Sequence, residues 1–96
     1  DFIRQCHTSK FIRLEGLFSH LAWTDNPAFT QTQLERWHGL LAELESPATG
    51  TPLPLPRYLH IANSGGALNY PDARGNLVRV GIALYGYGEG AAEAFA

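Results

Sequence analysis

Apolar residues follow two different spacings along the chain, and each spacing predicts a different kind of element. Residues 11–22 contain a near-continuous apolar run, which is typical of a strand covered on both faces. A helix is expected next, because large apolar side chains recur at helical spacing with charged residues on the other side. These apolar positions are Leu34, Trp37, Leu41 and Leu44. Thr30 and Gln33 fit a capping box, which places the start of this helix at Thr30.

Shorter elements follow a proline-rich connection at residues 46–56. They are expected as a strand at 57–62, a short helix at 64–68, a strand at 77–80, a helical turn at 81–86 and a helix at 91–96. Ser64 is the expected N-cap of the short helix. The alternation of strands and helices predicts an α/β fold with about three βα units and parallel strands. Because three strands cannot bury a parallel sheet on both faces, we expect residues 1–96 to be an internal segment of a larger domain.

The amino-acid composition limits the kinds of partner that we expect for the chain. It has 96 residues and a formal net charge of -2, and its seven basic residues are scattered, so a nucleic-acid partner is not expected. No apolar run approaches the ~20 residues that span a bilayer, so no membrane segment is expected either. The single Cys6 excludes an internal disulfide framework and agrees with a cytoplasmic location.

Two strand-to-helix corners, at residues 62–66 and 78–82, carry the candidate chemistry. Backbone N–H groups at such a corner are unpaired and favour an anion, so the two together predict a phosphate site. Arg79 lies where it could contact a group attached to that phosphate, and His20 ends an earlier strand. No cluster of residues has the spacing of metal ligands, and none forms a hydrolytic triad.

Three segments resemble alanine racemases: Leu14 to His20, His60 to Ser64, and Val78 to Gly86. The resemblance covers residues 13–86. It implies that the chain is part of an N-terminal (β/α)8 barrel, a TIM barrel, which binds pyridoxal 5'-phosphate in an isomerase that interconverts L- and D-alanine. A homodimeric enzyme that supplies D-alanine for peptidoglycan is further implied.

The same resemblance implies roles for the cofactor-binding residues at the phosphate. Ser64 would contact the cofactor phosphate by its hydroxyl and backbone, and Gly81 and Ile82 would offer backbone N–H groups to it. Gly81 suits this role because a residue without Cβ lets an anion approach the backbone.

At the ring, Arg79 would face the pyridine nitrogen, His20 would lie beside the ring and hydrogen-bond toward Arg79, and Asn63 would position both. Arginine keeps its proton, so it would make the ring a weaker electron acceptor and limit side transamination.

The proton-transfer groups of this family have no counterpart in the matched segments, so no catalytic residue is expected in this chain. Lys10 lacks the sequence setting of the family's lysine, and the tyrosine base belongs to a following domain. Three alternatives stay open. The chain could belong to a related barrel that binds pyridoxal phosphate without racemising, or to a racemase for serine or for a broader range of amino acids. It could also be a non-catalytic module, either a phosphate-binding half-barrel or a packing fragment.

Overall fold

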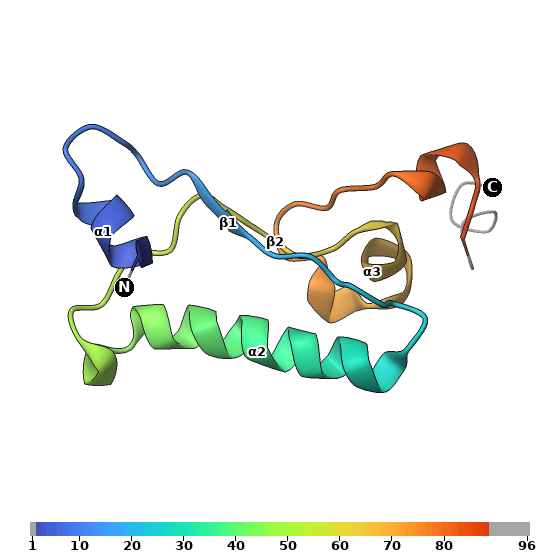
Figure 1. Ribbon diagram of the computed structural model, residues 1–96, viewed down its shortest axis with the longest axis horizontal. Coiled ribbons are helices and arrows are strands. Elements are labelled where there is room, and N and C mark those ends of the chain that lie inside the picture. The colour runs from blue at the N-terminus through green and yellow to red at the C-terminus, as the bar shows by residue number, and fades with distance from the viewer. Residues whose placement is uncertain (1, 89–96) are drawn as a thin grey trace.

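The computed structural model describes residues 2–88 and shows two parallel strands joined by a long helix (Figure 1). The elements are α1 (Phe2–Thr8), β1 (Gly16–Phe18), α2 (Pro27–Glu45), β2 (Tyr58–His60) and α3 (Ser64–Asn69). Single 3₁₀ turns lie at Pro47–Thr49, Pro71–Ala73 and Ile82–Tyr85. The α/β order with parallel strands agrees with the sequence pattern. The helix expected at residues 91–96 lies outside the described residues.

The two strands pair in parallel, with Leu17 opposite Leu59 and Phe18 opposite His60. Successive side chains of a strand point to opposite faces, so these two pairs lie on different faces of the ribbon. The Leu17 and Leu59 side chains pack against the buried core. Phe18 and His60 therefore form the face that points away from α2.

Helix α2 begins three residues earlier than expected. The side chain of Asn26 accepts a hydrogen bond from the Phe29 N–H, and Pro27 follows at the first helical position. Thr30, expected as the cap, is instead fully buried inside the helix, where its hydroxyl donates to the Trp23 carbonyl at 3.0 Å. The capping-box prediction was wrong because a stronger signal, Asn followed by Pro, lies just upstream.

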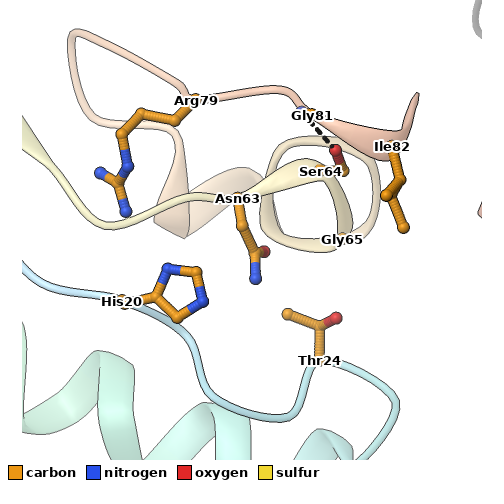
Figure 2. A pocket seen from close by; sticks show the side chains of 8 residues that line it. All are labelled: His20, Thr24, Asn63, Ser64, Gly65, Arg79, Gly81 and Ile82. Atoms are coloured by element: carbon orange, nitrogen blue, oxygen red, sulfur yellow. Dashed lines mark hydrogen bonds between the residues drawn. The ribbon is translucent and has the colours of Figure 1, made fainter. Parts of the chain in front are cut away.

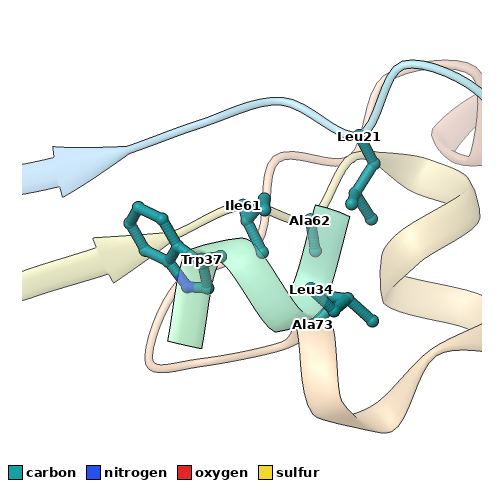
Figure 3. Close-up of a cluster of buried hydrophobic side chains, with 6 residues drawn as sticks. All are labelled: Leu21, Leu34, Trp37, Ile61, Ala62 and Ala73. Atoms are coloured by element: carbon teal, nitrogen blue, oxygen red, sulfur yellow. The ribbon is translucent and has the colours of Figure 1, made fainter. Parts of the chain in front are cut away.

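The core forms where α2 crosses the ends of the two strands (Figure 3). Its buried side chains are Leu21, Leu34, Trp37, Ile61, Ala62 and Ala73. Leu34 and Trp37 come from the predicted apolar face of α2, and Leu44 of that face is also buried. This packing fixes the segments that follow β1 and β2 against one helix.

The strand expected at residues 77–80 is extended chain but is not a strand in the described part of the molecule. Among residues 2–88, one backbone hydrogen bond connects this segment to the chain after β2: the Arg79 N–H donates to the Ala62 carbonyl at 2.9 Å. The Asn76 side chain occupies the outer edge of β2 instead. It accepts from the Leu59 N–H at 2.9 Å and donates to the Arg57 carbonyl at 2.8 Å. An amide side chain thus replaces two backbone groups of a third strand.

The proline-rich connection lies at the end of the molecule near α1, and α3 lies toward the other end (Figure 1). Within it, Leu53 is buried and its N–H donates to the Leu44 carbonyl at 2.8 Å, which fixes the chain before β2. Residues 50–52 are exposed. Within residues 2–88, no helix combines the length and the hydropathy that crossing a membrane requires.

Candidate functional site

A cavity of about 350 Å³ lies at the carboxyl ends of β1 and β2 (Figure 2). Ligand sites in parallel α/β folds form at this edge, because the loops after the strands meet there. The structure brings all six predicted cofactor-binding residues to this one cavity: His20, Asn63, Ser64, Arg79, Gly81 and Ile82. Thr24 and Gly65 complete the lining and were not predicted from the sequence.

Ser64 joins the two corners. Its hydroxyl oxygen accepts hydrogen bonds from the Gly81 N–H at 2.9 Å and the Ala83 N–H at 3.1 Å, and the residue is 5% exposed. A serine hydroxyl has two lone pairs and one O–H donor. Because both lone pairs are used within the protein, the O–H remains available to donate to an acceptor in the cavity.

Ser64 is the first residue of α3 and not its cap, which corrects the sequence prediction. Asn63 is the cap: its Oδ1 accepts from the Gly66 N–H at 3.0 Å, while its Nδ2 donates to the Leu21 carbonyl at 3.0 Å. The Asn63 side chain therefore fixes the segment after β1 to the start of α3. The Arg79 side chain is not one of its hydrogen-bond partners among the described residues.

The backbone donors at the cavity differ from expectation in one respect. The Gly81 N–H was expected to be free for an anion but donates to Ser64. The Ile82 N–H has no hydrogen-bond partner within residues 2–88 and remains available. A Cβ added to Gly81 would meet no protein atom within 4 Å, so this side of the backbone borders open space.

Gly65 sits closely against the segment that follows β1. A Cβ on Gly65 would lie 2.2 Å from Thr24 Oγ1 and 2.8 Å from Thr24 Cβ. The Tyr70 hydroxyl donates to the Thr24 carbonyl at 2.8 Å and holds the two segments together. The absence of a side chain at Gly65 thus sets how closely α3 approaches this wall of the cavity.

Arg79 extends along the carboxyl ends of both strands. Its guanidinium contacts Nδ1 and the carbonyl of His60, and it donates to the Ser19 carbonyl at 2.8 Å. His20 was expected as its imidazole partner, but within residues 2–88 the imidazole that Arg79 contacts is that of His60. His60 ends β2, whereas His20 lies two residues beyond the end of β1. His60 is the register partner of Phe18, whose ring lies beneath the guanidinium.

The contact of His60 with Arg79 was not predicted from the sequence. Partial burial, followed by the nearby Arg79 charge, lowers the pKa of His60 below 6.5. A neutral ring that accepts at Nδ1 carries its proton on Nε2. The available signal was its position at the end of the second strand, three residues before Asn63.

Gln33 of α2 holds the chain that carries His20. Its Oε1 accepts from the Ala22 N–H at 2.9 Å and its Nε2 donates to the His20 carbonyl at 3.3 Å. The predicted role of Gln33 in a capping box is thus replaced by a contact with the site. The His20 ring lines the cavity.

The donor set suits a phosphate ester with an attached ring. Its lining includes the hydroxyls of Ser64 and Thr24, the Arg79 guanidinium and the Ile82 N–H, which is unpaired within residues 2–88, and none of its lining residues is acidic. Within residues 2–88, no group of His, Cys, Asp and Glu side chains has a geometry that could hold a metal ion.

Comparison with known proteins gives one consistent result. The family model described as alanine racemase, N-terminal domain, matches residues 1–89. The chain is 40% identical over 77 residues to an alanine racemase of Symbiobacterium thermophilum, covering 78% of this chain and 19% of that protein. It is 36% identical over 88 residues to an alanine racemase of Ligilactobacillus salivarius, covering 90% and 21%.

A solved structure agrees with these relatives. The crystal structure of alanine racemase from E. faecalis matches with a TM-score of 0.75 and 35% identity, over 91% of this chain and 22% of that one. This likeness confirms the expected fold class, a partial (β/α)8 barrel. The chain spans about a fifth of the length of the relatives that it matches.

Proposed function

The chain belongs to the family of alanine racemase N-terminal domains, and from this premise we propose that it forms the cofactor-binding segment of a racemase that interconverts L- and D-alanine. The observation that carries the proposal is the convergence of three segments distant in sequence on one cavity. These segments carry the six residues for which the family resemblance implies contact with pyridoxal 5'-phosphate.

At the phosphate end, the Ser64 O–H and the Ile82 N–H are the proposed donors. Both lie at the junction of the two corners and neither is used within the described residues. Charge-assisted hydrogen bonds to an anion are stronger than neutral ones, so two such donors and an open approach beside Gly81 favour a phosphate.

At the ring end, Arg79 is the proposed partner of the pyridine nitrogen. A guanidinium has five N–H donors, and three hydrogen bonds hold it to His60 and Ser19, so two N–H groups remain. Arginine stays protonated and therefore donates without giving up its proton. When bound, the cofactor supplies an electron-accepting ring that acidifies the Cα proton of an amino acid.

His20 and Asn63 are proposed as further contacts to the cofactor, between the two ends of the cavity. Figure 2 shows both side chains between the Arg79 end and the Thr24 end of the cavity. The Asn63 amide is held at both ends by protein partners, so it supplies a fixed wall rather than a mobile ligand. The Gln33 contact fixes the backbone of His20 in the same way.

The groups that move protons are proposed to lie outside these residues, in line with the family resemblance. The whole protein is then a cytoplasmic homodimer with alanine as its substrate, which supplies D-alanine for peptidoglycan. Segment 1–96 provides binding and orientation of the cofactor and does not racemise by itself.

The proposal is tested on the whole protein that contains this segment. Purified protein is expected to retain pyridoxal phosphate, detected by its visible absorption, and to interconvert D- and L-alanine in a chiral chromatography assay. Bound cofactor without racemisation would favour the non-racemising alternative, and faster turnover of serine would favour a serine or broad-specificity racemase. Absence of both cofactor binding and racemisation would refute the proposal.

A charge-reversal variant tests the role of Arg79. Arg79→Glu is expected to increase side transamination, measured as pyruvate formed per racemisation event, because an acidic partner leaves the ring a stronger electron acceptor. Arg36→Glu on the exposed surface of α2 makes the same charge change away from the cavity and serves as the control. An unchanged ratio of pyruvate to racemisation events in Arg79→Glu would refute the assignment of Arg79 as the partner of the pyridine nitrogen.

A further inference from the structure

Phe18 contacts two of the site's side chains without lining the cavity itself. Its ring stacks on the His60 imidazole, with ring centroids 5.5 Å apart and planes 9° from parallel. The Arg79 guanidinium carbon lies 5.4 Å from the centroid of the same ring. One aromatic side chain therefore touches both members of the Arg79–His60 pair.

We propose that Phe18 is a positioning residue for Arg79, which it orients through simultaneous ring contacts with the guanidinium and with the His60 imidazole. This inference rests on the proposed function, in which Arg79 faces the cofactor ring.

The hydrogen bonds of the Arg79 guanidinium are one part of what holds it, and the Phe18 ring is the other. Arginine has a long side chain with many rotamers, and the groups that anchor Arg79 belong to only two residues, Ser19 and His60. A cation is attracted to the face of an aromatic ring, which gives the guanidinium a further contact from β1. Phe18 and His60 are register partners in the parallel ribbon, so this contact comes from a regular element and not from a loop.

The stacking also acts on His60. Arg79 can donate to Nδ1 only while the imidazole is neutral with its proton on Nε2. A ring stacked parallel on the imidazole holds the plane in which Nδ1 faces the guanidinium. The lowered pKa of His60, caused first by burial and then by Arg79, agrees with this arrangement.

The experiment replaces the ring in the whole protein and follows two measurements. Histidine ¹⁵N spectra of the cofactor-free protein, at a pH where imidazoles are neutral, report which ring nitrogen of His60 carries the proton. Steady-state kinetics with alanine, after loading with pyridoxal 5'-phosphate, separate kcat from KM.

Phe18→Leu is expected to give a mixture of His60 tautomers and to lower kcat about tenfold with little change in KM, because the contacts that are lost orient the cofactor's partner and not the substrate. Phe18→Tyr keeps the aromatic face and is expected to restore the single tautomer and the kcat. Phe11→Leu makes the same change at a side chain that is 94% exposed and is expected to alter neither measurement.

A single His60 tautomer and an unchanged kcat in Phe18→Leu would overturn the proposal. So would a Phe18→Tyr variant as impaired as Phe18→Leu. If Phe18→Leu does not fold, as judged by circular dichroism, Phe18→Met carries the same expectation.

The two measurements also separate this proposal from the proposed function. A protein that neither binds pyridoxal phosphate nor racemises alanine, but whose His60 tautomers respond to Phe18→Leu, would refute the function while supporting the ordering of the pair by Phe18. An active, cofactor-loaded enzyme whose His60 tautomers and kcat do not change in Phe18→Leu would support the proposed function and refute the positioning role of Phe18.

Discussion

Replacing Ser64 by alanine tests whether one hydroxyl holds the two corners of the cavity together. The change removes the acceptor of two backbone donors, the Gly81 N–H and the Ala83 N–H. Ala83 is fully buried, so its orphaned N–H costs about 1–3 kcal/mol. Gly81 is exposed and can turn to water, so its lost bond costs about 0.5–1.5 kcal/mol.

Together these terms weaken the attachment of the 3₁₀ turn Ile82–Tyr85 by about 1.5–4.5 kcal/mol. Since each 1.4 kcal/mol changes an equilibrium about tenfold, local opening of this turn is expected to increase about tenfold or more. The Leu84 and Gly86 amides report this opening, because their own acceptors, the carbonyls of Gly81 and Ala83, remain in the variant.

The assay is amide hydrogen exchange of the whole protein without cofactor, which resolves opening of individual segments. Ser19→Ala is the matched control, because Ser19 is exposed and its hydroxyl has no hydrogen-bond partner in the described part of the chain. Exchange of Leu84 and Gly86 that is as slow in Ser64→Ala as in Ser19→Ala would refute the reasoning. Pyridoxal phosphate is also expected to bind Ser64→Ala about tenfold more weakly, because one donor to its phosphate is lost.

Gly65→Ala is expected to lower the free energy of unfolding by about 1–3 kcal/mol, since its Cβ would lie 2.2 Å from Thr24 Oγ1. In Gly39→Ala of α2, the added Cβ meets no neighbour within 4 Å, and the free energy of unfolding is expected to rise by up to about 1 kcal/mol. Equal urea midpoints for the two variants would contradict the steric clash at Gly65. The lowered pKa of His60 predicts a pH dependence: its contribution to stability is complete above pH 6.5 and is lost as the pH falls through the folded-state pKa. His60→Gln is expected to abolish this contribution, and a stability difference from the parent that stays constant from about pH 5 to pH 8 would argue against it. In Arg79→Gln, the His60 pKa measured by NMR is expected to move back toward 6.5, because one of its two causes is removed.

Elements with a strong, continuous pattern could be predicted from the sequence. The apolar face of α2 was predicted because a helix beside a sheet must repeat its buried positions every three or four residues. The six cavity residues were implied as a set by the family resemblance, and they lie together because parallel strands end at one edge. Their roles toward a cofactor stay predictions.

Features for which two nearby residues were both suitable could not be predicted from the sequence. Asn26 and Thr30 both suit a helix cap, as do Asn63 and Ser64, and tertiary contacts decide between them: Thr30 is buried against the Trp23 carbonyl, and Ser64 is used by Gly81 and Ala83. Which histidine meets Arg79 depends on strand register, and no local pattern contains that information.

The strand expected at residues 77–80 shows a further limit. Three of its four residues are apolar, but Asn76 uses its side-chain amide to bond the edge of β2 just before the segment begins. Gly75 adopts a φ of +52° and lies against the Leu59 carbonyl, which brings Asn76 to that edge. A side chain that takes the place of a neighbouring strand's backbone groups leaves no periodic signal in the sequence.

The proline-rich connection has a consequence for engineering. Exposed residues 50–52 lie at the α1 end of the molecule, away from α3 and the cavity (Figure 1). Loop tips of this kind accept insertions and new chain ends more readily than packed elements. A purification tag, a fluorescent domain or the termini of a circular permutant can be placed there. The buried Leu53 just downstream marks the limit beyond which such grafts would disturb the start of β2.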